Sequence, residues 1–229
     1  LIVTPGWEWH DYGNEGTEAG VWIDALDLPL VQYLDSCGYL RSIEEEIGYQ
    51  LSERKRLTPR KAGISEQRYS AVGLRPMTQG QGTSRRAGLI HYRWAATYAA
   101  LRRLAEQESD PFDDVMMEYV NPETGGSLYR TFACCIQMIR PGVKTRAHRQ
   151  ASCAVYYVFE GKGQSVIDGR TYDWSEGDFF VVPSYFWHEH ANTAKEPAIL
   201  FSLQDFPLMK NLGIYREEAH ADGHQKIRG

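Results

Sequence analysis

Short hydrophobic runs separated by turns dominate the C-terminal half of this 229-residue chain. The runs are rich in Val, Ile, Phe and Tyr, which favour strands. The turns between them contain Gly-Gly, Pro-Gly and Asp-Gly pairs, which are typical of strand connections. The pattern predicts β-strands over residues 115–120, 132–140, 154–159 and 179–183. We therefore expect an all-β fold.

One segment has helical periodicity instead. Residues 94–107 are rich in Ala, Leu and Arg, and the apolar side chains of Tyr98, Leu101 and Leu104 recur at helical spacing. Pro111 follows shortly after the segment and favours termination of the helix. We expect one helix here, within an otherwise irregular polar linker.

An internal repeat organises the chain. Residues 1–34 align without a gap on residues 179–212, at an offset of 178 positions. The positions identical in both copies are, in the numbering of the first copy, Val3, Pro5, Trp9, His10, Asn14, Glu18, Asp27, Pro29, Leu30 and Leu34. Chance is a poor explanation for so many identities.

The two copies differ in extent. The chain contains no first-copy counterpart of residues 113–178, so the second barrel is expected to be complete and the first incomplete. We expect the chain to begin partway through a domain. The predicted parts are the final strands of a first barrel at 1–40, a linker at 41–110, a second barrel at 111–219 and a tail at 220–229.

The composition argues against nucleic-acid-binding and membrane proteins. Thirty acidic against twenty-five basic residues leave a formal net charge of −5, which offers no basic surface for nucleic acid or an anionic membrane. No apolar run is long enough to span a bilayer. The four cysteines show no CxxC spacing and are expected to be reduced, and the first residues lack the features of a signal peptide. We expect a cytoplasmic protein.

Two motifs in the second copy resemble those of cupins. Gly142, His148, Gln150 and Gly161 match the spacing of the first cupin motif, and residues 177–192, which include Pro183, His188 and Asn192, match the second. Cupins are double-sheet jelly rolls (double-stranded β-helices) in which histidines hold a metal at the mouth of the barrel. The repeat therefore implies a bicupin whose first cupin is incomplete.

Longer strings resemble the gentisate 1,2-dioxygenase family, which includes salicylate and 1-hydroxy-2-naphthoate dioxygenases. They include Asn-Pro-Glu-Thr-Gly-Gly at 121–126, Gln-Met-Ile-Arg-Pro-Gly at 137–142, Trp-His-Glu-His at 187–190 and Leu-Gly-Ile-Tyr-Arg-Glu at 212–217. The resemblance implies an Fe(II)-dependent oxidoreductase of aromatic catabolism that cleaves the ring of an aromatic hydroxy-acid with O2. It also implies a homo-oligomer, a dimer or a tetramer.

The resemblance gives roles to residues of the first copy. His10 matches the third iron ligand of the N-terminal cupin. The two partner histidines that the resemblance implies have no counterpart in this chain, and the alternative is a rim histidine in a turn. Asp24, expected on the following strand, matches an acid near the substrate hydroxyl, and the alternative is a turn-capping aspartate. Tyr12 stands where the family usually has a histidine that contacts the substrate carboxylate, and it could instead only fill the cavity. Trp7 is a candidate substrate wall or a packing residue.

The second copy departs from the metal-binding pattern. His148 and His188 occupy ligand positions, but Gln150 replaces the second histidine of the His-x-His motif, and an amide oxygen is a weaker ligand for Fe(II) than an imidazole. His190 could join His188, because alternate residues of a strand face the same side. We expect this barrel to be mainly structural, with a residual metal on these four side chains as the alternative.

Two other functions stay open at this point. A chain without a complete three-histidine site could be a non-catalytic cupin with a binding or structural role. A metal held by His148, Gln150 and His188 would instead indicate a cupin metalloenzyme that uses its second barrel.

Overall fold

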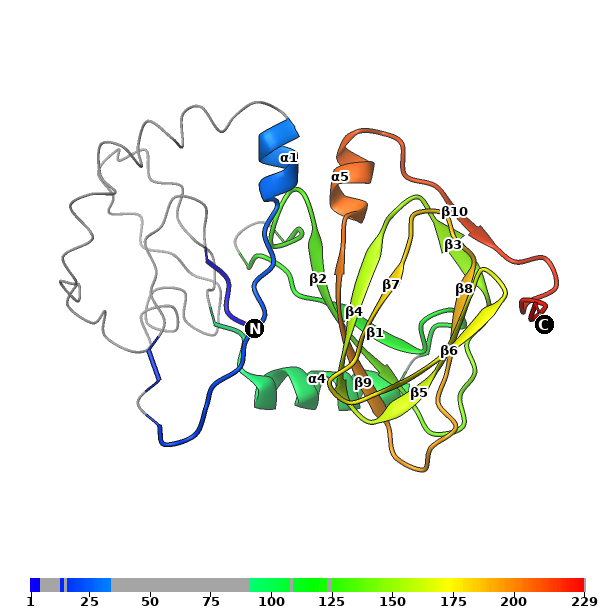
Figure 1. Ribbon diagram of the computed structural model, residues 1–229, viewed down its shortest axis with the longest axis horizontal. Helices are drawn as coiled ribbons and strands as arrows, with labels where there is room; N and C mark the ends of the chain where they lie inside the picture. The colour runs from blue at the N-terminus through cyan, green and yellow to red at the C-terminus, as the bar shows by residue number, and fades with distance from the viewer. Residues whose placement is uncertain (5–12, 15, 34–90, 108, 123–124, 229) are drawn as a thin grey trace. The chain divides into compact units, whose positions relative to one another are not determined.

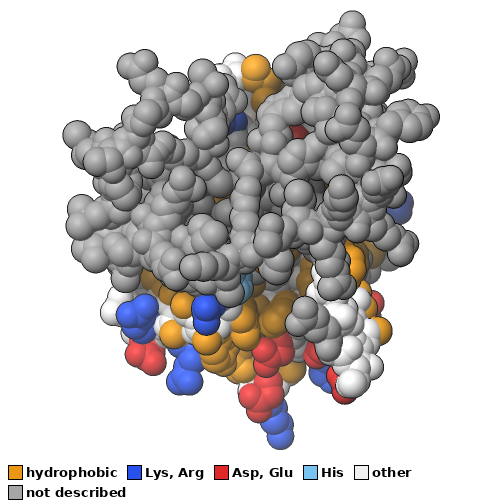
Figure 2. Space-filling model, turned by 90° about the vertical axis from the view of Figure 1, so that its left-hand side faces the viewer, with side chains coloured by type: hydrophobic (Ala, Val, Ile, Leu, Met, Phe, Trp, Pro, Cys, Tyr) orange, Lys and Arg blue, Asp and Glu red, His pale blue; other side chains and the backbone are white. Residues whose placement is uncertain are grey.

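A computed structural model describes residues 1–4, 13–14, 16–33, 91–107, 109–122 and 125–228. The chain divides into two compact units, one of Leu1–Val3 with Gly88–Gly229 and one of Thr4–Ala87. Among the described residues no helix is both long and apolar enough to cross a membrane. In the part of Figure 2 that is not grey, Lys and Arg side chains lie near Asp and Glu side chains, with hydrophobic side chains between them.

The larger unit is a sandwich of two five-stranded antiparallel sheets (Figure 1). The first sheet has the strand order β1 (Val115–Glu118), β2 (Ala133–Ile139), β9 (Ala198–Gln204), β4 (Ala154–Glu160) and β7 (Phe179–Val182). The second has the order β10 (Glu217–Ala219), β3 (His148–Gln150), β8 (His188–Ala191), β5 (Lys162–Ile167) and β6 (Arg170–Ser175). This is the predicted all-β jelly roll.

The four strands predicted from the sequence are confirmed as β1, β2, β4 and β7. The predicted helix is confirmed as α4 (Trp94–Gln107), whose buried residue is Leu101. Every residue of β2 is buried, because one face of the strand lies inside the sandwich and the other packs against α4. Three described cysteines, Cys134, Cys135 and Cys153, are free thiols, as expected.

The hydrophobic core has two parts. One lies between the sheets and includes Tyr156, Val158, Trp174 and Leu200. The other lies under α4, where Leu101 packs with side chains of β1, β2 and β9. The first core rigidifies the barrel, and the second covers the outer face of its central strands.

The two copies of the repeat share local structure. Helix α1 (Leu28–Tyr33) and helix α5 (Phe206–Asn211) occupy corresponding positions at the offset of 178 residues. Asn14 donates from Nδ2 to the carbonyl of Glu18 at 2.6 Å, and Asn192 makes the corresponding bond to Glu196 at 2.8 Å. Equivalent asparagine side chains thus hold equivalent turns.

The strand expected around Asp24 is not formed. No strand is assigned to residues 20–27, and the side chain of Val21 is 94% exposed. The corresponding segment of the second copy is β9, which is held between β2 and β4. A strand needs partners for its backbone hydrogen bonds, and none of the described strands pairs with residues 20–27.

The C-terminal tail packs on the barrel rather than projecting from it. The side chain of Gln225 donates to the carbonyl of Val166 at 2.8 Å and accepts from the backbone N–H of Gly169 at 2.8 Å. His224 lies 3.0 Å from the buried carboxylate of Glu189, which also pairs with Lys144 at 3.3 Å. The tail therefore covers the outer face of the sheet that contains β5 and β8.

The repeated asparagine turn provides a matched pair of variants. Asn192 is 1% exposed, and its Nδ2 also donates to the carbonyl of Ile139 at 2.8 Å. Asn192→Ala should lower the free energy of unfolding by about 1–3 kcal/mol, because it leaves buried backbone groups unpaired. Asn14 is exposed, so Asn14→Ala should cost less than about 0.5 kcal/mol. Urea denaturation measures both, and equal losses would contradict this account.

Candidate functional site

Three histidines meet inside the second barrel. His148 of β3 lies opposite His188 of β8, with ring centroids 4.2 Å apart. His190 lies on the same face of β8, with its ring centroid 5.7 Å from that of His188. All three side chains are buried. The strand alternation predicted from the sequence thus brings them together as expected.

A backbone carbonyl sets the tautomer of His188. Nδ1 of His188 lies 3.1 Å from the carbonyl oxygen of Phe186, which can only accept a hydrogen bond. Nδ1 therefore carries the proton and donates it. The lone pair of Nε2 points into the barrel and has no hydrogen-bond partner among the described residues. His188 is thus oriented as a ligating imidazole would be.

Ser165 and Trp174 hold the ring of His190. Ser165 Oγ accepts a hydrogen bond from Trp174 Nε1 at 2.8 Å and lies 2.7 Å from His190 Nδ1. The serine oxygen has a second lone pair as well as its own hydrogen, so it pairs with Nδ1 in either tautomer of the imidazole. Nε2 of His190 has no hydrogen-bond partner among the described residues. The Trp174–Ser165–His190 chain therefore fixes the orientation of the His190 ring.

Both the oxygen and the nitrogen of the Gln150 side-chain amide make hydrogen bonds. Its Oε1 accepts from the hydroxyl of Tyr215 at 3.0 Å, and its Nε2 donates to Oε1 of Gln204 at 3.1 Å. Gln204 in turn donates to Ser202 Oγ at 3.2 Å. The amide that replaces a ligand in the cupin motif is therefore part of a hydrogen-bond chain across the barrel interior.

Burial sets the protonation states in this interior. Burial lowers the pKa of His188 to about 3, with a further contribution from His148. Burial also lowers the pKa of His190 well below its usual value, helped by the two neighbouring histidines. Burial raises the pKa of Asp113 to about 6, and the nearby His148 opposes this shift. Both histidines of β8 are therefore neutral at pH 7.

The unpaired histidine nitrogens of the second barrel are not grouped as a metal site. Nδ1 of His148, Nε2 of His188 and Nε2 of His190 have no hydrogen-bond partner among the described residues, and Gln150 is engaged by Tyr215 and Gln204. Across the part of the chain that the structure describes, no three His, Cys, Asp or Glu side chains are grouped so as to hold a metal ion. We therefore assign no chemistry to a metal in this barrel.

The candidate residues of the first copy are described only in part. His10, Tyr12 and Trp7 lie outside the described residues. Asp24 is described and its side chain is exposed. The structure therefore leaves the roles of these four residues as predictions.

Sequence reasoning missed the residues that engage the predicted ligands. Ser165, Gln204 and Tyr215 carry no cupin motif, although Tyr215 lies in the Leu-Gly-Ile-Tyr-Arg-Glu string. Their partners come from distant parts of the chain and depend on strand register, such as the pairing of Ser165 with His190 across β5 and β8. No local sequence signal could have found them.

Comparison with known proteins gives the site its context. Residues 135–203 match the family model described as a cupin domain. A 5-aminosalicylate 1,2-dioxygenase of Comamonas sp. is 37% identical to this chain, and the alignment covers all of this chain and 59% of the relative. A 1-hydroxy-2-naphthoate 1,2-dioxygenase of Nocardioides sp. is 31% identical over 96% of this chain and 54% of its own length. The chain thus spans somewhat more than half the length of these curated relatives.

The fold is similar to that of a solved relative. The crystal structure of a salicylate 1,2-dioxygenase from Pseudaminobacter salicylatoxidans matches with a TM-score of 0.58 and 31% identity, over 70% of this chain and 47% of that one. The same enzyme has also been solved as an adduct with gentisate. Sequence and structure therefore point to the same group of proteins.

The buried histidines predict a pH dependence of stability. The pKa of His188 is about 3 in the folded state, against about 6.5 when unfolded. Below pH ~6.5 the unfolded chain binds a proton that the folded chain does not, so stability is full above this pH and is lost as the pH falls toward 3. Asp113 acts in the opposite direction, because its raised pKa of about 6 stabilises the folded state at low pH. The two histidines together change the stability more than the one carboxyl group does, so the net stability falls as the pH is lowered.

The measurement is the free energy of unfolding from pH 8 to 4 in the presence of a chelator. Each histidine contributes a slope of up to about 1.4 kcal/mol per pH unit. His188→Gln should reduce the slope below pH 6.5, and a slope equal to that of the unmodified protein would contradict the assignment.

Proposed function

Because this chain is homologous to the ring-cleaving 1,2-dioxygenases of gentisate, salicylates and 1-hydroxy-2-naphthoate, we propose that the protein is an Fe(II)-dependent dioxygenase. It acts with O2 on an aromatic hydroxy-acid. The observation that carries the proposal is the 37% identity to such an enzyme over the full length of this chain. The similarity extends through both copies of the repeat, so it includes His10 and its neighbours as well as the second barrel.

The proposal assigns the iron to the first copy. His10 is the ligand that this chain supplies, and neutral imidazoles suit Fe(II). When bound, the iron would bring the aromatic substrate and O2 together and allow electrons to pass between them. The second barrel supports this assignment, because Gln150 is engaged in hydrogen bonds and no three His, Cys, Asp or Glu side chains of the described residues are grouped so as to hold a metal.

Two further residues of the first copy would hold the substrate. The phenol of Tyr12 can donate one hydrogen bond to the substrate carboxylate but cannot become cationic, unlike the histidine usual in the family. Asp24 would hold the substrate hydroxyl and accept its proton. Trp7 would form a wall against the aromatic ring. Tyr12 therefore favours a substrate whose ring pattern differs from that of gentisate.

The proposal also covers location and assembly. Free Cys134, Cys135 and Cys153 are consistent with a reducing compartment, which supports the cytoplasm. We propose a homo-oligomer, a dimer or a tetramer, on the likeness to the family. Size-exclusion chromatography with light scattering measures its mass.

The direct test is iron content and O2 uptake of the full-length gene product purified with Fe(II), because this chain supplies one of the three expected histidine ligands. The intact mass is recorded on the same sample, and His10→Ala is the variant. Gentisate, salicylate, 5-aminosalicylate and 1-hydroxy-2-naphthoate are the substrates to compare. We expect about one iron per chain and O2 uptake with at least one of these acids. His10→Ala should lower O2 uptake at least about 100-fold, because a coordination bond to the iron is lost.

The matched control is His91→Ala, because the exposed His91 lies in an isolated bridge with Ile2. This variant should keep both iron and O2 uptake. A protein that binds no iron and consumes no O2 with any of the four acids would instead be a non-catalytic cupin. That result would overturn the proposal.

A further inference from the structure

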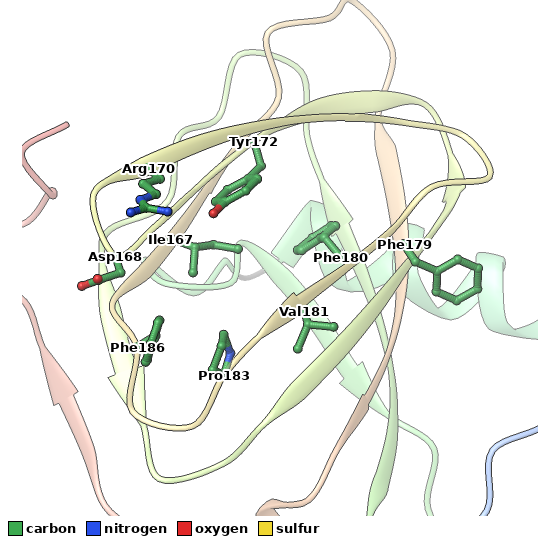
Figure 3. Close-up of a pocket in the computed structure, with 9 residues that line it drawn as sticks. All are labelled: Ile167, Asp168, Arg170, Tyr172, Phe179, Phe180, Val181, Pro183 and Phe186. Atoms are coloured by element: carbon green, nitrogen blue, oxygen red, sulfur yellow. The ribbon is translucent and has the colours of Figure 1, made fainter. Parts of the chain in front are cut away.

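A cavity opens between the edges of the two sheets. It has a volume of about 490 Å³, which is in the range of small-molecule sites. Its walls come from the β5–β6 turn on one side and from β7 and the loop after it on the other (Figure 3). β6 and β7 are the last strands of their sheets, so no strand closes the sandwich here.

The floor of the cavity is rigid and aromatic. Phe180 stacks on Tyr156 with ring centroids 4.8 Å apart and an interplanar angle of 8°. It also stacks on Trp174 at 6.1 Å and 13°. Ile167 lies beside it in the wall and is buried. A flat apolar surface is therefore held in place by the core behind it.

The sides of the cavity expose aromatic surface to solvent. Tyr172 is 45% exposed and Phe186 is 42% exposed. Tyr172 lies on the same face of β6 as the buried Trp174, so its ring lies at the opening between the sheets rather than outside them. Exposed aromatic rings around a concave apolar floor favour a planar ligand.

The cavity also carries one uncompensated positive charge. Arg170 lines it and makes no ion pair or side-chain hydrogen bond with the described residues. The carboxylate of Asp168, which lies in the same turn, is paired with Arg228 at 3.3 Å. An unpaired guanidinium is well suited to a carboxylate, because its N–H groups match the two oxygens.

We propose that this cavity of the second barrel binds a planar aromatic carboxylate. The ring packs against Phe180 between Tyr172 and Phe186, and the carboxylate pairs with Arg170. The ligand is bound without reaction. The proposal rests on the cavity alone and holds whether or not the protein is a dioxygenase.

The test is equilibrium binding of 1-naphthoate, an aromatic acid without a ring hydroxyl, measured by titration calorimetry. The measurement uses His10→Ala protein treated with a chelator, so that binding at an iron centre does not contribute. We expect saturable binding with one site per chain. Arg170→Ala should weaken the affinity for 1-naphthoate about tenfold or more. The neutral amide of the same acid should bind to the unsubstituted cavity more weakly by a similar factor.

The matched control is Lys162→Ala, which removes a positive charge at the other end of the β5–β6 hairpin. It should leave the affinity unchanged, and both exposed substitutions should leave the melting temperature unchanged. Equal affinities of Arg170→Ala and Lys162→Ala, or no saturable binding, would overturn the proposal. A change of mass in solution in Arg170→Ala or Phe186→Ala, without an effect on binding, would also overturn it and would identify a contact between chains.

Discussion

The need to pair buried polar groups governs the second barrel. Its inward-facing positions carry imidazoles, amides and hydroxyls rather than only hydrocarbon, and an unpaired group there would cost about 1–3 kcal/mol. Two hydrogen-bond chains meet part of this need. One joins Trp174, Ser165 and His190, and the other joins Tyr215, Gln150 and Gln204. Each chain fixes the orientation of polar side chains inside the barrel, while Nδ1 of His148 and Nε2 of His188 and His190 have no partner among the described residues.

The two copies share local structure. The asparagine turns and the short helices α1 and α5 are the same in both copies. In the second copy His188 faces His148 across the barrel, but no three His, Cys, Asp or Glu side chains of the described residues are grouped so as to hold a metal. We therefore propose a scaffold role for the second copy and an iron role for the first.

Local sequence patterns predicted much of the fold and less of the site. The hydrophobic runs predicted β1, β2, β4 and β7, and the helical spacing predicted α4, because each depends on neighbouring residues. Period-two alternation placed His188 and His190 on one face correctly. The predicted strand around Asp24 was wrong, since a strand depends on partners elsewhere in the chain. The orientations of the His188 and His190 rings depend on contacts with Phe186 and Ser165, and contacts of that kind cannot be read from the sequence.

The central claim is that the first copy binds the iron and the second copy does not. The most direct test is the number of iron atoms bound per chain in the full-length gene product and in its His188→Gln variant, with circular dichroism confirming that both are folded. The account predicts about one iron per chain in each, because His188 contributes to no complete ligand set. Loss of iron in His188→Gln would contradict it and would place the metal in the second barrel.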